Sequence, residues 1–492
     1  MDGQQSQEAE YERLGHKQLT LVDVVAQSVG FMGPVFSSAF LIPAIAGIIS
    51  ATGKGAGIAA PLAVLIAAIG VFALGWIVAQ YSKRIHAAGS LYDYVSNGLG
   101  RTLGAATGWL YYGGTIVLTC GLGVLVGGFI HDTIQAEFNR EPLPIWAWNV
   151  LWAVALFLVL YLGVQISTRV QLTLALISVA VVLTFFIYVI VKVGGDNDVA
   201  KAFDPSGSTT GDLNGVLFGV LYGVLIFVGF ETAANLAEET SQPKRQIPRA
   251  VMFSVVAVSI FYLIASYAQV AGFGFHLDTL ASAAAAPLFA LASPAEAGGF
   301  GSTTLVRIME LVVLFDILAV GVGAAVASTR GVFAMARDRR LPAPLASVSS
   351  RFGTPTGSIA FLIFIQALFI LGTEFWDDLF ALPETPHYFA IFLWGSTFGG
   401  FALVVVYLLM SLGSLFGLRD LPNRVGLWIS AILGLAISGG AIYGSFADVT
   451  SPILLGPVYA LVLFGVGLLA SFVFKGREPA VKVIHALRTH QE

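Results

Sequence analysis

The chain has 492 residues, of which 57% are hydrophobic and 11% are charged, and its net charge is -4. Soluble globular proteins carry roughly 25% charged residues, so this composition excludes a water-exposed globular surface and predicts a protein embedded in a lipid bilayer. The small net charge offers no binding surface for nucleic acid, and the single cysteine, Cys120, excludes an internal disulfide framework.

The apolar segments predict how the chain crosses the bilayer. A helix needs about 20 mainly apolar residues to cross the hydrocarbon core. The continuous apolar runs exclude a β-barrel, whose strands read as short alternating segments. Residues 1–17 are polar and lack a basic region or a small-residue cleavage site, so we expect the first apolar segment to remain as an anchor helix. Twelve spans are predicted, at residues 20–49, 58–80, 104–131, 145–163, 169–193, 213–238, 247–273, 304–336, 357–375, 386–413, 424–446 and 453–474.

The distribution of basic residues predicts the orientation of these spans. If the N-terminus is cytoplasmic, 20 of the 25 lysines and arginines fall in cytoplasmic segments and 5 in outer ones. Cytoplasmic loops of membrane proteins carry an excess of lysine and arginine. We therefore expect a multi-pass protein of the plasma (inner) membrane with both termini in the cytoplasm.

The first predicted span contains a helix-breaking sequence near its middle. Pro34 lacks a backbone donor and clashes with the preceding turn, and Gly30 and Gly33 lower the cost of leaving helical geometry. Ser37 and Ser38 can then satisfy freed backbone groups or a ligand. The segment is compatible with a binding site at an interrupted helix, as transporters use, and with a proline kink that has no function.

The sixth predicted span carries a carboxylate inside its apolar stretch. Glu231 follows Phe227-Val228-Gly229-Phe230. A carboxylate at membrane depth is costly and normally faces a cavity, a partner or a proton path; the alternative is a hydrogen bond to a neighbouring helix. Glu238 and Glu239 lie close to the cytoplasmic end, where we expect solvated capping rather than a functional role.

The two breaks fall at corresponding positions if spans 1–5 and 6–10 are inverted copies of each other. This predicts an all-α membrane protein that is a secondary transporter. Its expected parts are a cytoplasmic tail (1–19), a first repeat (20–193), an extracellular loop (194–212), a second repeat (213–413), two further helices (414–474) and a second cytoplasmic tail (475–492).

Four separated motifs add a family resemblance. The first, in the second-to-third loop, is Ala88-Gly89-Ser90-Leu91-Tyr92-Asp93-Tyr94 with Gly108-Trp109, and the second, in the sixth span, is Phe227–Glu231. The third, in the loop that follows the sixth span, is Glu238-Glu239-Thr240 with residues 243–249. The fourth, at the end of the eighth span, is residues 328–338 with Leu341-Pro342 and Gly353-Thr354-Pro355. The chain resembles the amino acid–polyamine–organocation (APC) permeases over spans 1–10. The resemblance implies a LeuT-like fold, with a five-plus-five inverted repeat and two extra helices, working by alternating access.

The resemblance also implies where cargo binds in the first span. In the family, a Gly-Ser/Ala-Gly triplet holds the cargo carboxylate through backbone amides, and this triplet matches Phe36-Ser37-Ser38. Ser37 keeps the middle identity, whereas both glycines are missing. We interpret Gly33 and Pro34 as taking over the helix break one turn earlier.

Further implied contacts lie in the sixth and third spans. Backbone carbonyls around Phe227 to Gly229 match the family's contacts with the cargo amine, and Glu231 matches its gating or coupling acid. The aromatic gate of some relatives matches Leu225 here, which leaves two alternatives, a roomier pocket or a gate formed by Phe230 instead. The family's third-span wall matches Tyr111, Tyr112 and Thr115, for which plain packing is the alternative.

Two coupling ions are compatible with the sequence. A buried carboxyl group can take up and release a proton near neutral pH, so Glu231 favours a proton. Ser328 and Thr329 match hydroxyls that complete a sodium site in sodium-coupled relatives, and such oxygens suit a hard cation. Packing between helices is the alternative for these two residues. We expect no cofactor and no metal besides this sodium site.

Asp316 is a second carboxylate within a predicted span, the eighth, and matches no site of the family. Two hypotheses stay open for it. It pairs with a cationic group of the cargo, which favours a polyamine, ethanolamine or a basic amino acid, or it pairs within the protein.

Rival classes find less support in the sequence. No span shows the polar stripe of a channel, the histidines lie in loops, tails or span ends rather than in a catalytic set, and no phosphate-binding loop indicates ATP-driven transport. We therefore expect no enzyme but a proton-coupled permease for amino acids. Transport of polyamines or amino alcohols, amino acid exchange, and a transporter-like nutrient sensor remain the alternatives.

Overall fold

The computed structural model describes residues 19–48, 53–283, 287–383, 385–447 and 449–474. The predictions for the two terminal tails therefore lie outside the described residues, apart from Leu19. Helices dominate the fold, and two isolated bridges are the only β-structure in these ranges. The α-helices are α2 (Leu21–Met32), α3 (Pro34–Phe40), α4 (Ile42–Ile45), α5 (Ala60–Ser82), α6 (Leu91–Leu99), α7 (Arg101–Phe138), α8 (Ile145–Leu162), α9 (Val164–Val193), α10 (Val199–Ala202), α11 (Leu213–Leu225), α12 (Pro243–Gly272), α13 (Leu277–Ser282), α14 (Pro287–Ala292), α15 (Thr303–Arg337), α16 (Thr356–Phe375), α17 (His387–Gly417), α18 (Arg424–Gly444) and α19 (Leu455–Val473).

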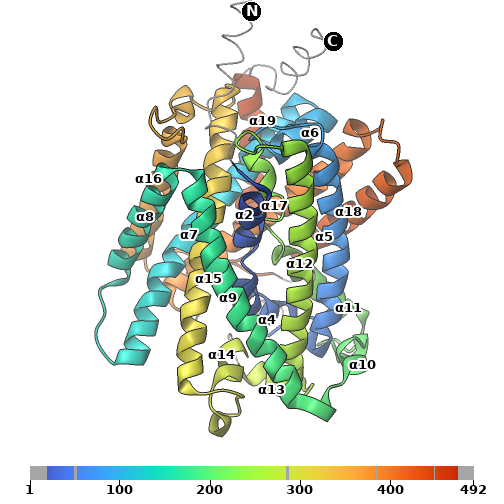
Figure 1. The fold of residues 1–492 in the computed structure, drawn as a ribbon, viewed down its shortest axis with the longest axis vertical. Helices are drawn as coiled ribbons and strands as arrows, with labels where there is room; N and C mark the ends of the chain where they lie inside the picture. Colours follow the sequence, from blue (N-terminus) through green and yellow to red (C-terminus); the bar gives the residue numbers. More distant parts are fainter. Residues whose placement is uncertain (1–18, 49–52, 284–286, 384, 448, 475–492) are drawn as a thin grey trace, which may run out of the picture.

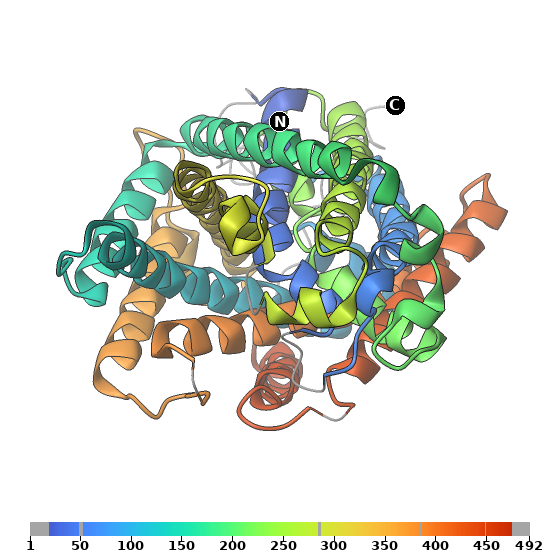
Figure 2. The same ribbon diagram turned by 90° about the horizontal axis from the view of Figure 1, so that it is seen from below.

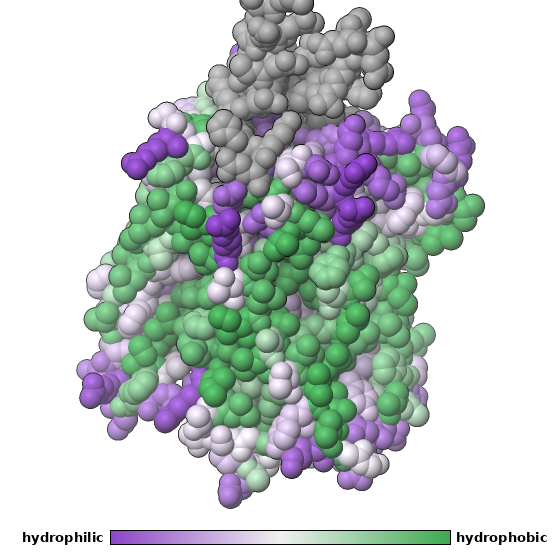
Figure 3. Space-filling view, viewed as in Figure 1, coloured by the Kyte–Doolittle hydropathy of each residue, from purple (hydrophilic) through white to green (hydrophobic). Residues whose placement is uncertain are grey.

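Eleven helical segments in the described ranges are long and apolar enough to cross a membrane. They coincide with eleven of the twelve predicted spans. The sixth predicted span, residues 213–238, instead contains the 13-residue helix α11 followed by turns, so the count of twelve stays a prediction. The first predicted span, residues 20–49, was too long, because the apolar segment that can cross the membrane ends at Phe40. Figure 3 shows the resulting hydrophobic belt between two hydrophilic ends.

The interior of the bundle consists of the first span and three long helices. In the 18-residue apolar stretches of α15 and α17, 78% of each stretch is buried, and in those of α7 and the segment Leu21–Phe40 the buried share is 72%. In the corresponding stretches of α19 and α8 only 22% and 28% is buried, which places these helices at the periphery. In the end-on view of Figure 2, green, yellow and orange helices lie on several sides of the dark blue first span.

Small residues allow the central helices to approach closely. α7 packs along α17, and a Cβ added at Gly114 would lie 2.6 Å from the Cβ of Ala402. A Cβ at Gly399 would lie 2.8 Å from the carbonyl oxygen of Gly114. In a lipid environment, close packing of this kind supplies much of the attraction between helices.

Figure 1 shows the short helix α6 toward one end of the bundle, which we call the upper end, while α13 and α14 lie at the lower end. The second-to-third loop, which carries one of the four motifs, forms α6 at the upper end with Tyr92, Asp93 and Tyr94 buried.

Candidate functional site

The first span is interrupted at Gly33, as the sequence predicted. α2 ends at Met32 and α3 begins at Pro34, with Gly33 at a φ of 55° between them. A side chain is disfavoured there by the backbone conformation and by contact, because an added Cβ would lie 2.2 Å from Cγ2 of Val320. The break therefore depends on glycine at this position.

The free amides at the start of α3 bind a carboxylate from another helix. The backbone N–H groups of Val35 and Phe36 donate to Oδ2 of Asp316, on α15, at 2.9 and 2.7 Å. The first turn of a helix leaves such donors without intrahelical partners. Oδ1 of the same carboxylate is buried and has no hydrogen-bond partner among the described residues. The sequence singled out Asp316 but did not indicate that it reaches the first break.

The two serines that were predicted to bind cargo, Ser37 and Ser38, donate their hydroxyls to backbone carbonyls at this break. Ser37 donates its N–H to the carbonyl of Gly33 at 2.8 Å and its hydroxyl to that of Met32 at 3.0 Å. The Ser38 hydroxyl donates to the carbonyl of Val35 at 2.8 Å. The amide donors that the break leaves unpaired within α3 thus lie at Val35 and Phe36, not at Ser37 and Ser38.

A second break interrupts the sixth span and lies against the first. α11 ends at Leu225, residues 226–231 form turns, and a short 3-10 helix, η4, spans Thr232–Leu236. Gly229 has a φ of 113°, and an added Cβ would lie 2.8 Å from Cγ of Phe31 and 3.1 Å from the backbone nitrogen of Met32. The two breaks are therefore in direct contact.

Tyr262, on α12, links the two breaks. Its hydroxyl lies 3.1 Å from the carbonyl oxygen of Met32 and 2.7 Å from that of Ile226, and can donate to either. Its ring packs edge-on against Phe227, with 5.2 Å between the ring centroids. No pattern in the sequence indicates this role, because a tyrosine in an apolar helix is usually a packing residue.

Glu231 is fully buried between two tyrosine hydroxyls. Tyr111, on α7, donates to Oε1 at 2.9 Å, and Tyr407, on α17, donates to Oε2 at 2.9 Å. Phe230 packs against Tyr407, with ring centroids 5.4 Å apart. Tyr111 and Phe230 thus lie in the same cluster as Glu231, whereas the sequence did not indicate Tyr407.

The other third-span residues point elsewhere. The Tyr112 hydroxyl donates to the carbonyl of Gly89 at 2.6 Å and accepts from the side chain of Asn235 at 3.3 Å. Thr115 donates to the carbonyl of Tyr112 at 3.1 Å. Tyr112 therefore anchors the loop before α6, and its hydroxyl does not contact Glu231.

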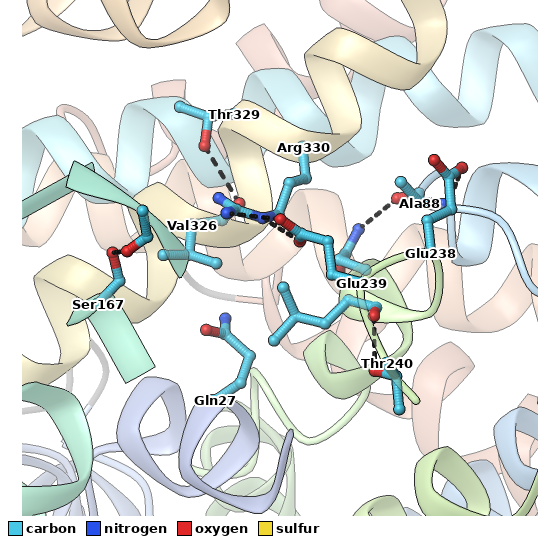
Figure 4. Close-up of polar contacts among 12 residues, drawn as sticks. Gln27, Ala88, Ser167, Glu238, Glu239, Thr240, Val326, Thr329 and Arg330 are labelled. Carbon is cyan, nitrogen blue, oxygen red and sulfur yellow. Dashed lines mark hydrogen bonds and ion pairs between the residues drawn. The ribbon is translucent and has the colours of Figure 1, made fainter. Parts of the chain in front are cut away.

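Ser328 and Thr329 lie buried on α15, where their hydroxyls donate to the carbonyl of Ala325 at 3.1 and 2.7 Å. Nearby, the side chain of Gln27 donates to the carbonyl of Gly323 at 2.9 Å, joining α2 to α15. Figure 4 shows Gln27, Thr329 and Arg330 in one region. Hydroxyl oxygens that donate in this way keep lone pairs that can accept.

A buried ion pair closes the upper end beside these residues. Arg330 binds Glu239 through Nε at 2.8 Å and Nη2 at 3.3 Å, and the side chains are 1% and 3% exposed (Figure 4). The backbone carbonyl of Glu239 also accepts the N–H of Leu19 at 3.0 Å. The prediction that Glu239 caps a helix in solvent was wrong, because sequence spacing cannot place an arginine from α15 beside it.

Glu238 makes a second ion pair at the same end. Its two carboxylate oxygens accept from Arg337 at 2.8 Å each, and Oε1 also accepts the backbone N–H of Ala88 at 2.9 Å. The prediction of a solvated cap was wrong here too.

Asp338 is the residue after Arg337. Burial is the largest influence on its carboxyl group and raises its pKa to about 6, while the charge of Arg337 acts to lower this pKa.

Toward the lower end, aromatic rings cover the first break. Phe36 packs edge-on against Phe392 at 5.7 Å between centroids, and Phe40 lies 6.1 Å from Phe389 and 6.4 Å from Phe129. Gly33 is buried beside this cluster. With the ion pairs above and the rings below, the break is shielded on both sides in this conformation.

A cavity of about 390 Å³ opens among α7, α8, α16 and α17. Its lining includes the acidic residues Asp132, Glu374 and Asp377 together with Trp146 and Tyr388. Tyr388 donates a hydrogen bond to Asp132. This cavity has an acidic and aromatic wall, and the sequence did not predict it.

Comparisons with known proteins agree on the class of molecule. The sequence profile of the family described as amino acid permease matches residues 32–472. The aromatic amino acid transport protein AroP of Corynebacterium glutamicum is 25% identical over 459 residues, covering 87% of this chain and 91% of AroP. The branched-chain amino acid permease BcaP of Bacillus subtilis is 23% identical over 334 residues, covering 63% and 67%. The methylthioribose transporter of the same organism is 25% identical over 325 residues, covering 63% and 66%.

A solved structure supports the fold. The crystal structure of a mutant of the manganese transporter of Eremococcus coleocola matches with a TM-score of 0.52 over 92% of this chain and 93% of that one, at 13% identity. This likeness confirms the predicted all-α, LeuT-like fold.

Proposed function

The chain belongs to the amino acid permease family, and from that premise we propose that it is a secondary active transporter of amino acids that works by alternating access. The contact between the two helix breaks carries this proposal. Interrupted helices that meet deep in a bundle expose backbone donors and acceptors where a regular helix would pair them. Both breaks here are buried, so a change of conformation has to admit the cargo.

The proposed cargo site lies around Gly33, Ser37, Ser38, Phe227 and Gly229. Phe230, Tyr111 and Glu231 form its wall toward α7 and α17, while Tyr112 and Thr115 support that wall from behind. Carbonyl oxygens at the second break receive the cargo amine in this scheme. The relation between the breaks also supports inverted repeats at residues 20–193 and 213–413.

We propose that Glu231 couples transport to protons. The carboxyl group is buried between Tyr111 and Tyr407, and each hydroxyl can donate to a carboxylate or accept from a carboxylic acid. Both protonation states therefore find partners without rearrangement of the helices. The alternative ion is sodium, held by Ser328 and Thr329 with backbone carbonyls.

The upper end is proposed to face the cytoplasm, in a plasma or inner membrane, because the basic residues favour that orientation. In this scheme the pairs Arg330–Glu239 and Arg337–Glu238 close the inner pathway. The acidic cavity lined by Asp132 and Glu374 faces outward, where its charge concentrates cationic solutes.

Counterflow in proteoliposomes tests the proposed function. Vesicles containing the full chain are loaded with an unlabelled amino acid and given a trace of the labelled one, across a panel of branched-chain, aromatic, basic and small amino acids. A transporter accumulates label transiently, and imposed proton or sodium gradients then identify the coupling ion. Binding without exchange of label would favour the nutrient-sensor alternative and contradict transport.

A further inference from the structure

The position of Asp316 at the first break bears on what part of the cargo is recognised there. Its Oδ2 accepts the N–H groups of Val35 and Phe36 at 2.9 and 2.7 Å. A carboxylate oxygen of a cargo molecule bound to the same two amides would have to occupy the same place. Two carboxylates so close together repel each other. While Asp316 holds this position, the first break is closed to the carboxylate of an amino acid.

The same side chain has an unused acceptor. Oδ1 of Asp316 is buried, and no described residue donates a hydrogen bond to it. No lysine or arginine in the described ranges forms an ion pair with this carboxylate. A buried carboxylate without a cation or a full set of donors is unfavourable, and a cationic donor brought to Oδ1 would relieve that deficit.

Apart from the two amides of Val35 and Phe36, which donate to Oδ2, the groups beside Asp316 are apolar or accept hydrogen bonds. Gly33 and Val320 lie beside it, and the carbonyl of Met32 belongs to the same break. Tyr262, on α12, is a titratable neighbour of Asp316, and its hydroxyl is directed at the carbonyls of Met32 and Ile226. Because the amides donate to Oδ2 and the Tyr262 hydroxyl to carbonyls, no donor in the described ranges reaches Oδ1, and an ammonium group suits this oxygen better than an anion does.

We propose that Asp316 takes the place of a cargo carboxylate at the first break and binds the ammonium group of the cargo through Oδ1. The inference rests on the proposed transport function and specifies its substrate class. The cargo is a primary organic amine, and a carboxylate on the cargo is not required. Amino acids are accepted through their amino group, and the corresponding amines without a carboxylate are accepted as well.

The test compares three molecules that share one side chain. Leucine carries both charged groups, isopentylamine only the ammonium group, and 4-methylpentanoate only the carboxylate. Ornithine and putrescine form a second pair for a protein that prefers basic cargo. Displacement of a bound labelled amino acid is measured on the purified full-length protein, which does not require a functional transport cycle.

The wild-type protein should bind the amine within about tenfold of the amino acid and should reject the carboxylate. The Asp316→Asn variant keeps an oxygen for the two amides but loses the charge, so its affinity for the amine should fall at least about tenfold. Asp316→Ala frees the amides of Val35 and Phe36, and binding of 4-methylpentanoate should increase. The wild-type measurements remain decisive if either variant fails to fold.

Two results would overturn the inference: a wild-type protein that binds amino acids but rejects every amine without a carboxylate, or an Asp316→Asn variant with unchanged affinity for amines. The proposed function fails on a different result, the absence of counterflow for every labelled cargo that the protein binds. The two failures are therefore distinguishable.

Discussion

The Tyr407 hydroxyl, on α17, lies 2.9 Å from Oε2 of Glu231 in the interrupted sixth span. Tyr111 donates to the other oxygen from α7. The carboxyl group is thus held between two helices of the central bundle, and any movement of the second break relative to α7 or α17 changes its environment.

Glu231→Gln should flatten the pH dependence of amino acid uptake between about pH 5 and 8, because the amide cannot exchange a proton. Initial uptake rates in proteoliposomes at a series of external pH values measure this. Tyr407→Phe is the matched control. It removes one donor and costs about 1–3 kcal/mol for the unpaired oxygen, so it should lower the rate and keep a pH dependence. An unaltered profile in Glu231→Gln would exclude this residue as the coupling group.

Gly229→Ala should abolish uptake while the protein remains folded. The φ of 113° is strained for alanine, and the added Cβ would press against Phe31 and the backbone of Met32. Gly163→Ala separates the two effects, since Gly163 has a φ of 128° but an added Cβ meets nothing within 4 Å. Uptake and size-exclusion profiles should show a folded but inactive Gly229→Ala protein beside an active Gly163→Ala protein. Equal activity of the two would mean that contact between the breaks is unimportant.

Arg330→Ala should open the upper end of the bundle. The substitution leaves the carboxylate of Glu239 buried and unpaired in the closed conformation. This destabilises the closed conformation by about 3–5 kcal/mol. A cysteine placed at Thr240 in a Cys120→Ser background should then react faster with a polar maleimide. The exposed pair Arg84–Asp420, at 2.6 Å, provides the control. Asp420→Asn should leave the labelling rate unchanged because exposed pairs contribute little. Similar labelling rates in both variants would contradict a closing role for Arg330.

Asp338 should make the protein more stable at mildly acidic pH. Its pKa is raised to about 6, so the folded protein binds a proton that the unfolded chain releases from about pH 4 upward. The contribution of Asp338 to the stability of the folded protein is therefore most favourable below about pH 4 and is lost as the pH rises through about 6. Tyr92, Arg337, Glu238, Arg340 and Asp93 face the group. When the pH is lowered from 8 to 5, the Tm of the wild type should rise relative to the Tm of Asp338→Asn. A constant difference would contradict the assignment.

Much of the fold follows from local sequence patterns. Runs of apolar residues located eleven spanning segments, since their length and composition depend on the bilayer alone. Gly33 and Pro34 predicted the first break because their backbone restrictions act within one turn. The end of the first span was placed too late, since the short helix α4 and its turns are as apolar as the span itself.

The candidate site was less predictable because its contacts join residues far apart in sequence. Asp316 reaches Val35 across 281 positions, and Arg330 reaches Glu239 across 91. A single sequence indicates that Asp316 and Glu231 are costly at membrane depth, but it does not indicate which donors satisfy them. Tyr407 and Tyr262 look like ordinary aromatic packing residues until the helices are assembled.

Glu239 joins three parts of the chain at once: its side chain binds Arg330 on α15, its backbone binds Leu19 ahead of α2, and it follows the second break directly. The backbone bridge holds the start of the first span to the end of the sixth, so separation from α15 breaks the Arg330–Glu239 ion pair while the bridge stays intact. Opening is accordingly cooperative. The start of the first span and the end of the sixth should leave α15 as a unit, in an all-or-none step rather than by gradual widening.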